Sequence, residues 1–258
     1  MAAEAQPYYS SLIVAAKING EVRDIQTVYD DTDEIQFIEL DTSLGWSIYR
    51  RSVLFLLIIA VNKIEHEAEV IAKFTVNKGL YCEIKTSGKD IDANFIDKVN
   101  KQMRQMIADN IPIIKYTIPR EEAIKLFQKS QRYGKVRLLS SLSTPIISLY
   151  ICESYSDYLY GPMLPETKHL NRFELDYEPH GVLIRTPDEM TRGRIRKRVS
   201  QPKFEHILYE SKEWANIMEC RFITDLNLIN EQGNMGELIR ISEALQEKRI
   251  AQIADHIS

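Results

Sequence analysis

A nine-residue apolar run, residues 53–61 (VLFLLIIAV), constrains the fold more than any other stretch of this chain. Arg50 and Arg51 precede it, and Asn62 and Lys63 follow it. The run is far shorter than the roughly 20 apolar residues that span a bilayer. A helix that is apolar on nearly all sides is buried in its own protein. We therefore predict a central buried helix over residues 47–64.

The residues before this helix predict a small β-sheet. Residues 12–18 and 21–25 are strand-like and flank Asn19 and Gly20. Asn-Gly between two such runs is a strong hairpin signal, because both residues tolerate positive φ. Residues 34–40 alternate apolar and polar side chains and predict a third strand.

After the central helix, helical and strand-like segments follow one another, separated by Pro, Gly and Ser turns. Further strands are predicted at residues 68–74, 79–84, 113–118, 136–139, 146–152, 173–177 and 182–185. Further helices are predicted at residues 90–110, 120–129, 204–218, 225–230 and 235–257. Long helices beside an apparently antiparallel sheet indicate an α+β fold.

Composition favours a soluble cytoplasmic protein with no membrane partner. The 258 residues are 44% hydrophobic and 27% charged, with a net charge of -4. A pI of 5.8 argues against indiscriminate binding to nucleic acid. Cys82, Cys152 and Cys220 are odd in number and widely spaced, as expected of free thiols in a reducing compartment. We expect Cys82 and Cys152 to be small buried side chains.

Common catalytic and cofactor motifs are missing from the sequence. No GxxxxGK[ST] or GxGxxG segment is present to hold phosphates. No two of the five histidines lie four residues apart, as they do in a helical zinc signature. A GxSxG nucleophile elbow is also missing. We therefore expect no catalytic residue, metal or cofactor in these 258 residues.

Several segments resemble the N-terminal part of threonyl-tRNA synthetases. Residues 14–20 (VAAKING) resemble the later part of their TGS domain. The other matching segments resemble their second additional domain, known as the SAD or editing domain, and are residues 77–84, 119–123 with Phe127, 155–157, 161–162 and Pro165. In that family this domain carries a metal and editing pocket of two helical histidines, four residues apart, and a cysteine and a histidine that flank Gly-Pro.

Carried over to this chain, those four positions are Arg51, Phe55, Leu159 and Met163, which we call the substituted pocket. None of the four is a histidine or cysteine. Arg51 keeps its proton and Phe55 has no lone pair, so neither is a metal ligand of the usual kind. The resemblance therefore implies an editing-type domain whose metal chemistry has been lost, with packing or ligand contact in its place.

A second resemblance covers nearly the whole chain, to the N-terminal region of bacterial nucleoside kinases of the uridine kinase and phosphoribulokinase type. The residues that carry it are 48–52, 78–84, 158–163, 201–203 and 239–254. In such proteins a P-loop kinase domain follows, and ATP and Mg would bind there. The last predicted helix has no glycine cap or proline stop, so the natural polypeptide is expected to continue; a frayed terminal helix is the alternative.

These resemblances predict three parts. Residues 1–45 would form a partial TGS-like β domain, residues 46–200 an editing-domain-like α+β domain, and residues 201–258 a helical linker towards the kinase domain. The first functional hypothesis is a non-catalytic regulatory or substrate-positioning module of an ATP-dependent uridine or nucleoside kinase. The alternatives are a tRNA-binding module related to threonyl-tRNA synthetases and, last, an aminoacyl-ester hydrolase working through Asp157 or His180.

Two further groups of residues are candidate binding sites. A polar pocket for a nucleoside or other small molecule is expected at Tyr81, Tyr155, Asp157 and Tyr160. Tyrosines at alternate positions of a strand, as in residues 155–160, are more often explained by cross-strand packing. The dense basic cluster is a candidate contact for phosphates or RNA and comprises Arg192, Arg194, Arg196, Lys197 and Arg198. Its alternatives are a solvated loop or a hairpin tip, since no aromatic residue is interleaved for base stacking.

Overall fold

The structure is a computed structural model that describes all residues except 77, 89–90, 200–212, 221–222 and 256–258. The chain divides into two compact units. The first contains Met1–Pro119 and Ile146–Arg198, and the second contains Arg120–Pro145 and Val199–Ser258. The three-part domain division proposed above stays a prediction.

Helix α2 (Ser43–Ile64) is the central element of the first unit, as the apolar run predicts. The Thr42 side chain caps it by accepting a hydrogen bond from the backbone N–H of Gly45 at 3.0 Å. A Cβ on Gly45 would lie 2.1 Å from the Glu39 carbonyl oxygen, so only glycine fits this first turn. The helix is long and apolar enough to cross a membrane, but 67% of its most apolar window is buried within the protein. It is therefore the core helix that the sequence predicts.

Three antiparallel sheets surround α2. The first has the order β2-β1-β3 and contains β1 (Ile13–Ile18), β2 (Glu21–Asp24) and β3 (Ile35–Glu39). The second has the order β4-β5-β10-β9 and contains β4 (Glu69–Val76), β5 (Gly79–Lys85), β9 (Glu174–Glu178) and β10 (Gly181–Arg185). The third has the order β6-β7-β8 and contains β6 (Ile114–Pro119), β7 (Ile146–Cys152) and β8 (Tyr155–Asp157). Together with the helices they confirm the predicted α+β fold.

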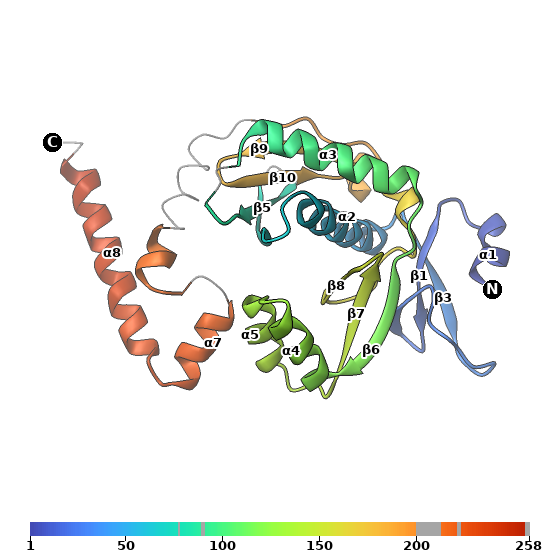
Figure 1. The fold of residues 1–258 in the computed structure, drawn as a ribbon, viewed down its shortest axis with the longest axis horizontal. Helices are drawn as coiled ribbons and strands as arrows, with labels where there is room; N and C mark the ends of the chain where they lie inside the picture. The colour runs from blue at the N-terminus through green and yellow to red at the C-terminus, as the bar shows by residue number, and fades with distance from the viewer. Residues whose placement is uncertain (77, 89–90, 200–212, 221–222, 256–258) are drawn as a thin grey trace. The chain divides into compact units, whose positions relative to one another are not determined.

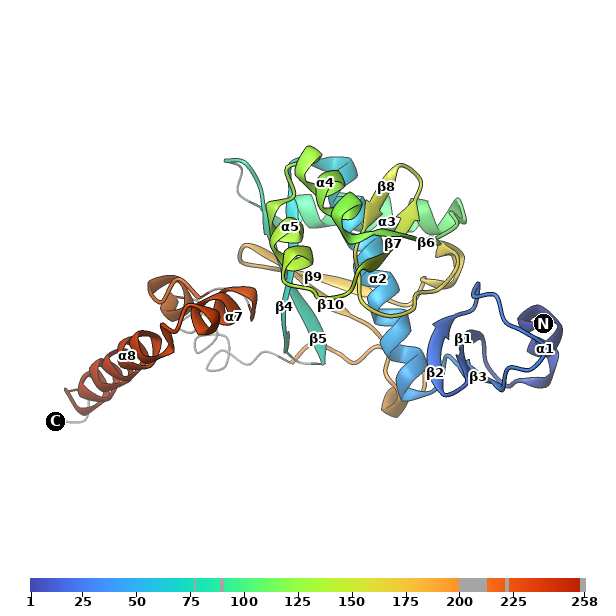
Figure 2. The same ribbon diagram turned by 90° about the horizontal axis from the view of Figure 1, so that it is seen from below.

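One hydrophobic core joins these layers. Figure 1 shows α2 between the four-stranded sheet and the β6-β7-β8 sheet, and Figure 2 shows the length of the same helix. The buried cluster contains α2 side chains together with residues of all three sheets, such as Val14, Cys82 and Tyr150. Helix α3 (Ala93–Ala108) packs against α2 and buries Met103 and Met106 in the same core.

Local backbone geometry agrees with two further predictions. Asn19 and Gly20 have φ values of 51° and 84°, as a tight hairpin between β1 and β2 requires. Cys82 and Cys152 are buried free thiols, as expected. Burial raises the pKa of Cys82 to about 12, so the thiol stays protonated.

The first ten residues form two short elements that the sequence did not suggest. These are α1 (Ala2–Ala5) and the 3-10 turn η1 (Gln6–Tyr8). The Gln6 side chain ties this segment to β1, because its oxygen accepts a hydrogen bond from the Ile13 N–H at 2.9 Å.

The second unit is helical in its described part. It contains α4 (Arg120–Lys129), α5 (Tyr133–Ser140), a helical stretch at residues 213–217, α7 (Ile223–Glu231) and α8 (Met235–Asp255). Within this unit Arg137 and Asp225 form an ion pair at 2.5 Å. Residues 204–212 of the helix predicted at 204–218, and residues 256–257 at the end of the last helix, lie outside the described residues, as do residues 201–203.

The strand predicted at residues 136–139 is wrong, because these residues lie in α5. A short apolar run fits a strand and a helical turn equally well, so its pattern alone cannot decide between them. Here α5 packs against α4 and buries Leu139 completely, which favours the helix.

Candidate functional site

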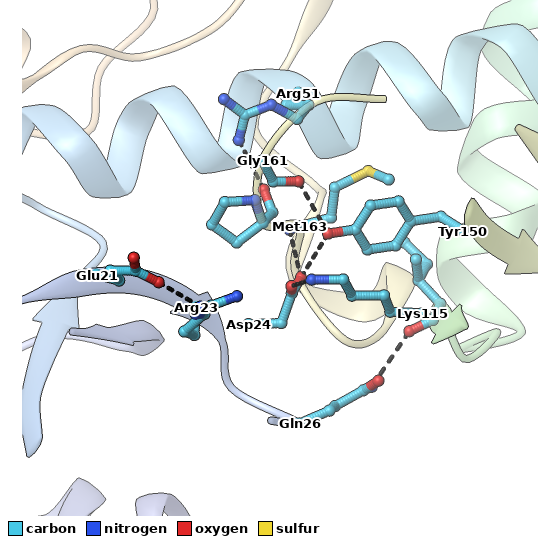
Figure 3. Close-up of polar contacts among 11 residues, drawn as sticks. Glu21, Arg23, Asp24, Gln26, Arg51, Lys115, Tyr150, Gly161 and Met163 are labelled. Carbon is cyan, nitrogen blue, oxygen red and sulfur yellow. Dashed lines mark hydrogen bonds and ion pairs between the residues drawn. The ribbon is translucent and has the colours of Figure 1, made fainter. Parts of the chain in front are cut away.

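A buried carboxylate, Asp24, organises the polar network at the place where the first and third sheets of the first unit meet. Only 5% of this residue is exposed. Asp24 Oδ2 pairs with Lys115 Nζ of β6 at 2.7 Å, and its Oδ1 accepts from the Tyr150 hydroxyl of β7 at 2.7 Å. Oδ1 also accepts from the Met163 backbone N–H at 3.1 Å (Figure 3). Three donors thus satisfy a charge that would otherwise be costly to bury.

The Tyr150 hydroxyl lies between two acceptors. It is 2.7 Å from Asp24 Oδ1 and 2.8 Å from the Gly161 carbonyl oxygen. Burial, followed by the negative charge of Asp24, raises the pKa of Tyr150 well above its usual range. The phenol therefore keeps its proton and holds Gly161 close to Asp24.

Arg51 covers the same loop from α2. Its Nη1 donates to the Pro162 carbonyl oxygen at 2.6 Å. Its guanidinium carbon lies 3.0 Å from the position that a Cβ on Gly161 would occupy, and Gly161 has a φ of 91°. Burial is the main factor that lowers the pKa of Arg51, although the charge of Asp24 opposes the change. The absence of a side chain at residue 161 makes room for this guanidinium.

Ser52, the next residue of α2, completes the attachment. Its hydroxyl donates to the Ile48 carbonyl oxygen at 3.0 Å and accepts from the Leu164 N–H at 2.9 Å. Side chains from β2, β7 and α2 thus hold every residue of the 161–164 loop through its backbone. These contacts fix the backbone of the loop and give it a structural role.

The other three members of the substituted pocket lie in or against the hydrophobic core. Phe55 is fully buried and Met163 is 2% exposed, while Leu159 is partly buried and packs against the same core cluster. The rings of Phe55 and Tyr155 lie 6.4 Å apart at 51°. Among the residues that the structure describes, no group of three or more His, Cys, Asp and Glu side chains is placed to hold a metal ion.

The residues expected to line a small-molecule pocket are not all brought together. Asp157 is 1% exposed and its Oδ1 accepts from the Tyr158 N–H at 2.7 Å, while Tyr160 is 84% exposed. Tyr81 belongs to the four-stranded sheet instead, where it stacks on Phe74 with ring centroids 5.1 Å apart. Its hydroxyl donates to the Pro179 carbonyl oxygen at 2.9 Å.

The basic cluster lies in a loop, not in a hairpin, and two of its cations are paired. Arg196 lies 3.3 Å from Asp188, and Arg198 lies 2.7 Å from Glu178. The side chains of Arg192, Arg194 and Lys197 are exposed and have no hydrogen-bond or ion-pair partner within the described part of the chain. These three cations are therefore available to a ligand.

His180, the alternative general base, lies in the turn between β9 and β10 with a φ of 63°. Asp157 lies on β8 in another sheet. No described contact joins the two residues, so a base and a second catalytic group are not assembled here.

Sequence reasoning missed Asp24, Lys115, Tyr150 and Ser52. Asp24 stands at the end of an ordinary hairpin strand, and its partners lie 91 to 139 residues away. The hydropathy pattern carries no sign of such pairing. The structure shows that β2 buries this charged residue, in the pattern exposed, intermediate, exposed, buried.

No family model matches the chain. Similarity is found instead to individual threonine–tRNA ligases. The ligase of Clostridium tetani is 30% identical over 167 residues, which are 63% of this chain and 25% of the ligase. The ligase of Syntrophotalea carbinolica is 28% identical over 163 residues, and that of Francisella tularensis subsp. novicida is 25% identical over 175 residues, or 68% of this chain.

The chain spans about a quarter of the length of these curated relatives, 25% to 27% of each. They give no support to a nucleoside-kinase parent. What they do support is the first resemblance drawn from the sequence: most of this chain is homologous to the N-terminal, TGS- and editing-like region of threonyl-tRNA synthetases.

Proposed function

We propose that this chain is a non-catalytic RNA-binding module, related to the N-terminal region of threonyl-tRNA synthetases, that recognises tRNA. The observation that carries the proposal is the similarity to threonine–tRNA ligases over 63% of the chain. Arg192, Arg194 and Lys197, three exposed cations without a side-chain partner among the described residues, support it, because binding to nucleic acid depends on neutralising phosphates. The proposal assigns the module no metal and no cofactor.

The substituted pocket supports a role without editing chemistry. Arg51 is a permanent cation whose donor is committed to the Pro162 carbonyl oxygen. Phe55 offers no lone pair, and Met163 lies in the core with a thioether that binds only soft metals. We therefore rank the aminoacyl-ester hydrolase last.

The nucleoside-kinase hypothesis ranks below the RNA-binding proposal. It rests on resemblance of short segments alone, one of which, residues 201–203, lies outside the described residues. The ligases favour the RNA-binding alternative. A kinase parent would require a GxxxxGK[ST] segment in the same natural polypeptide, and reading the coding sequence on either side of these residues tests this directly.

Binding of labelled tRNA, measured by fluorescence anisotropy at several salt concentrations, tests the RNA-binding proposal. We expect affinity to fall with salt, and the double variant Arg194→Gln/Lys197→Gln to bind more weakly. If both cations contact phosphates, the log–log salt slope of the variant should be smaller by about 1.5 to 2.

The matched control is Lys98→Gln/Lys101→Gln, which removes the same charge from the exposed face of α3. It should bind as the unmodified chain does. Equal losses in both variants would show that the loop is not the binding surface, and a chain that binds no tRNA at low salt would refute the proposal.

A further inference from the structure

A cavity of about 660 Å³ opens beside the first turns of α2, away from the substituted pocket. It lies between residues 10–12, the end of β3, and the segment from Lys168 to Gly193. All of its lining belongs to the first unit. The positive end of the α2 dipole adjoins it, which favours a negatively charged occupant.

Two guanidinium groups line this cavity, those of Arg172 and Arg192. Both residues are exposed, and neither side chain has a hydrogen bond or ion pair with the rest of the described chain. The third lining cation, Lys168, pairs with Glu166. The two arginines are therefore the cations that an incoming anion would meet.

The backbone fixes both arginines in place. The Arg172 N–H donates to the Tyr49 hydroxyl oxygen at 2.7 Å. Arg192 has a left-handed φ of 49° at the end of the 3-10 turn η3 (Glu189–Thr191), which Asp188 and Thr191 cap reciprocally. Arg172 Nη1 lies 2.7 Å from the position of a Cβ on Gly193, so its guanidinium lies against the residue that follows Arg192.

Two aromatic side chains, Trp46 and Tyr49, form part of the cavity wall. Trp46, 2% exposed, meets Tyr49 edge-on with ring centroids 5.3 Å apart. The Trp46 indole N–H is buried and has no hydrogen-bond partner in the described residues. Burial raises the pKa of Tyr49 to about 12, so its hydroxyl remains a neutral donor.

Two carboxylates, Asp41 and Glu189, line the same cavity and match the two arginines in number. The preference for an anion therefore rests on the arginine donors and the α2 dipole, not on net charge. Asp41 is hydrogen-bonded to Ser11, whose Oγ lies 3.1 Å from Asp41 Oδ1. Glu189 is exposed. The remaining ionisable residue, His169, has its pKa lowered by burial, so it is mainly neutral at physiological pH.

We infer that this cavity binds a phosphate group, held between Arg172 and Arg192 and carried either by a free nucleotide or by the end of an RNA chain. A phosphate offers several acceptor oxygens and matches the planar donors of arginine. Arg192 is common to this site and to the RNA-binding proposal, but Arg172, Arg194 and Lys197 are not. The variant Arg172→Gln therefore tests this inference, and Arg194→Gln/Lys197→Gln tests the other.

Fluorescence of Trp46 provides a direct test. The chain has two tryptophans, so the variant Trp214→Phe leaves Trp46 as the single reporter on the cavity wall. The probes are inorganic phosphate, adenosine 5′-monophosphate, and one short RNA with and without a 5′-phosphate. We expect a saturable change of Trp46 emission with probes that carry a terminal phosphate.

In the same background, Arg172→Gln and Arg192→Gln should each weaken binding roughly tenfold, as expected for one lost charge-assisted contact. Arg172→Lys should retain part of the affinity, and Lys98→Gln, on the exposed face of α3, should bind normally. Both Gln variants keep the backbone contacts that position the loop.

The probes also distinguish the two sources of phosphate. Tight binding of adenosine monophosphate identifies a free nucleotide, whereas preference for the 5′-phosphorylated RNA over the nucleotide and over the unphosphorylated RNA identifies an RNA end. The inference is overturned if no probe gives a saturable change, or if both Gln variants bind as tightly as the parent.

Discussion

Asp24 and Lys115 form a largely buried ion pair, 2.7 Å between Oδ2 and Nζ, that joins β2 of the first sheet to β6 of the third. With Tyr150 and the Met163 N–H, it makes Asp24 the point at which the small N-terminal sheet is attached to the rest of the first unit.

Replacing Asp24 with Asn should destabilise the protein strongly. The change leaves the Lys115 charge without its partner at a side chain that is only 27% exposed. Removing one member of a buried pair costs about 3–5 kcal/mol, and partial exposure of Lys115 places the expected loss near the lower end. Urea unfolding of the variant and the unmodified protein measures this loss of unfolding free energy.

The control for this change is Glu21→Gln, which breaks the exposed pair between Glu21 and Arg23. Its expected effect is at most about 1 kcal/mol. An Asp24→Asn loss as small as this would mean that the carboxylate is not structurally important.

Replacing Tyr150 with Phe should loosen the 161–164 loop. The change removes the hydroxyl that lies near both Asp24 Oδ1 and the Gly161 carbonyl oxygen. One lost hydrogen bond at a buried acceptor costs about 1–3 kcal/mol. Amide exchange of Met163 and Leu164 should accelerate more than that of the β9–β10 pair.

A double-mutant cycle of Tyr150→Phe with Asp24→Asn tests whether the two side chains are coupled energetically. Residues that share one hydrogen-bond network couple by about 0.5–3 kcal/mol. Simple additivity of the two losses would contradict the shared network.

Replacing Gly161 with Ala should destabilise the protein by more than replacing Gly20 with Ala. Both glycines have positive φ, 91° and 84°, so the backbone strain is comparable. A Cβ on Gly161 meets the Arg51 guanidinium, whereas a Cβ on Gly20 meets nothing within 4 Å. The difference in unfolding free energy isolates the contact with Arg51.

In the background Arg51→Ala, Gly161→Ala should lose this extra penalty. Thermal unfolding of the unmodified protein, the two single variants and the double variant measures the penalty of Gly161→Ala with and without Arg51. Equal penalties for Gly161→Ala with and without Arg51 would show that the guanidinium does not fill the space above Gly161.

The stability of the first unit should fall at acid pH partly through Glu166. Hydrogen bonding to Lys168, and then to Asn110, lowers the pKa of this carboxyl group below its ordinary value of 4.5. The unfolded chain therefore binds its proton at a higher pH than the folded chain does. The contribution is complete above pH 4.5 and is lost as the pH falls through the lower, folded-state pKa.

Glu166→Gln should flatten this part of the curve of unfolding free energy against pH. The measurement is chemical denaturation at a series of pH values between neutrality and the acid transition. An unchanged acid slope in the variant would exclude Glu166 as a contributor.

The fold was largely accessible from the sequence, because periodicity and turn chemistry are local. The apolar run predicts α2, and Asn19-Gly20 predicts the β1–β2 hairpin. The 136–139 segment could not be assigned correctly, since the choice between strand and helix depends on packing of α5 against α4.

The site was less accessible than the fold. Resemblance identified Arg51, but not the Pro162 carbonyl oxygen that its guanidinium contacts. The cavity beside α2 was not predicted at all, because Arg172 reaches Tyr49 and Gly193 only in the folded chain. Polar contacts between residues far apart in the chain produce no repeating pattern in the sequence, so periodicity cannot reveal them.

The contacts of Asp24 also determine when the N-terminal sheet can join the rest of the first unit during translation. Its partners lie 91, 126 and 139 residues further along the chain. A nascent chain that has not reached Tyr150 can therefore offer Asp24 only Lys115. The N-terminal hairpin is made first, but it becomes part of the cooperative unit only when residues up to Met163 have left the ribosome and closed this long loop.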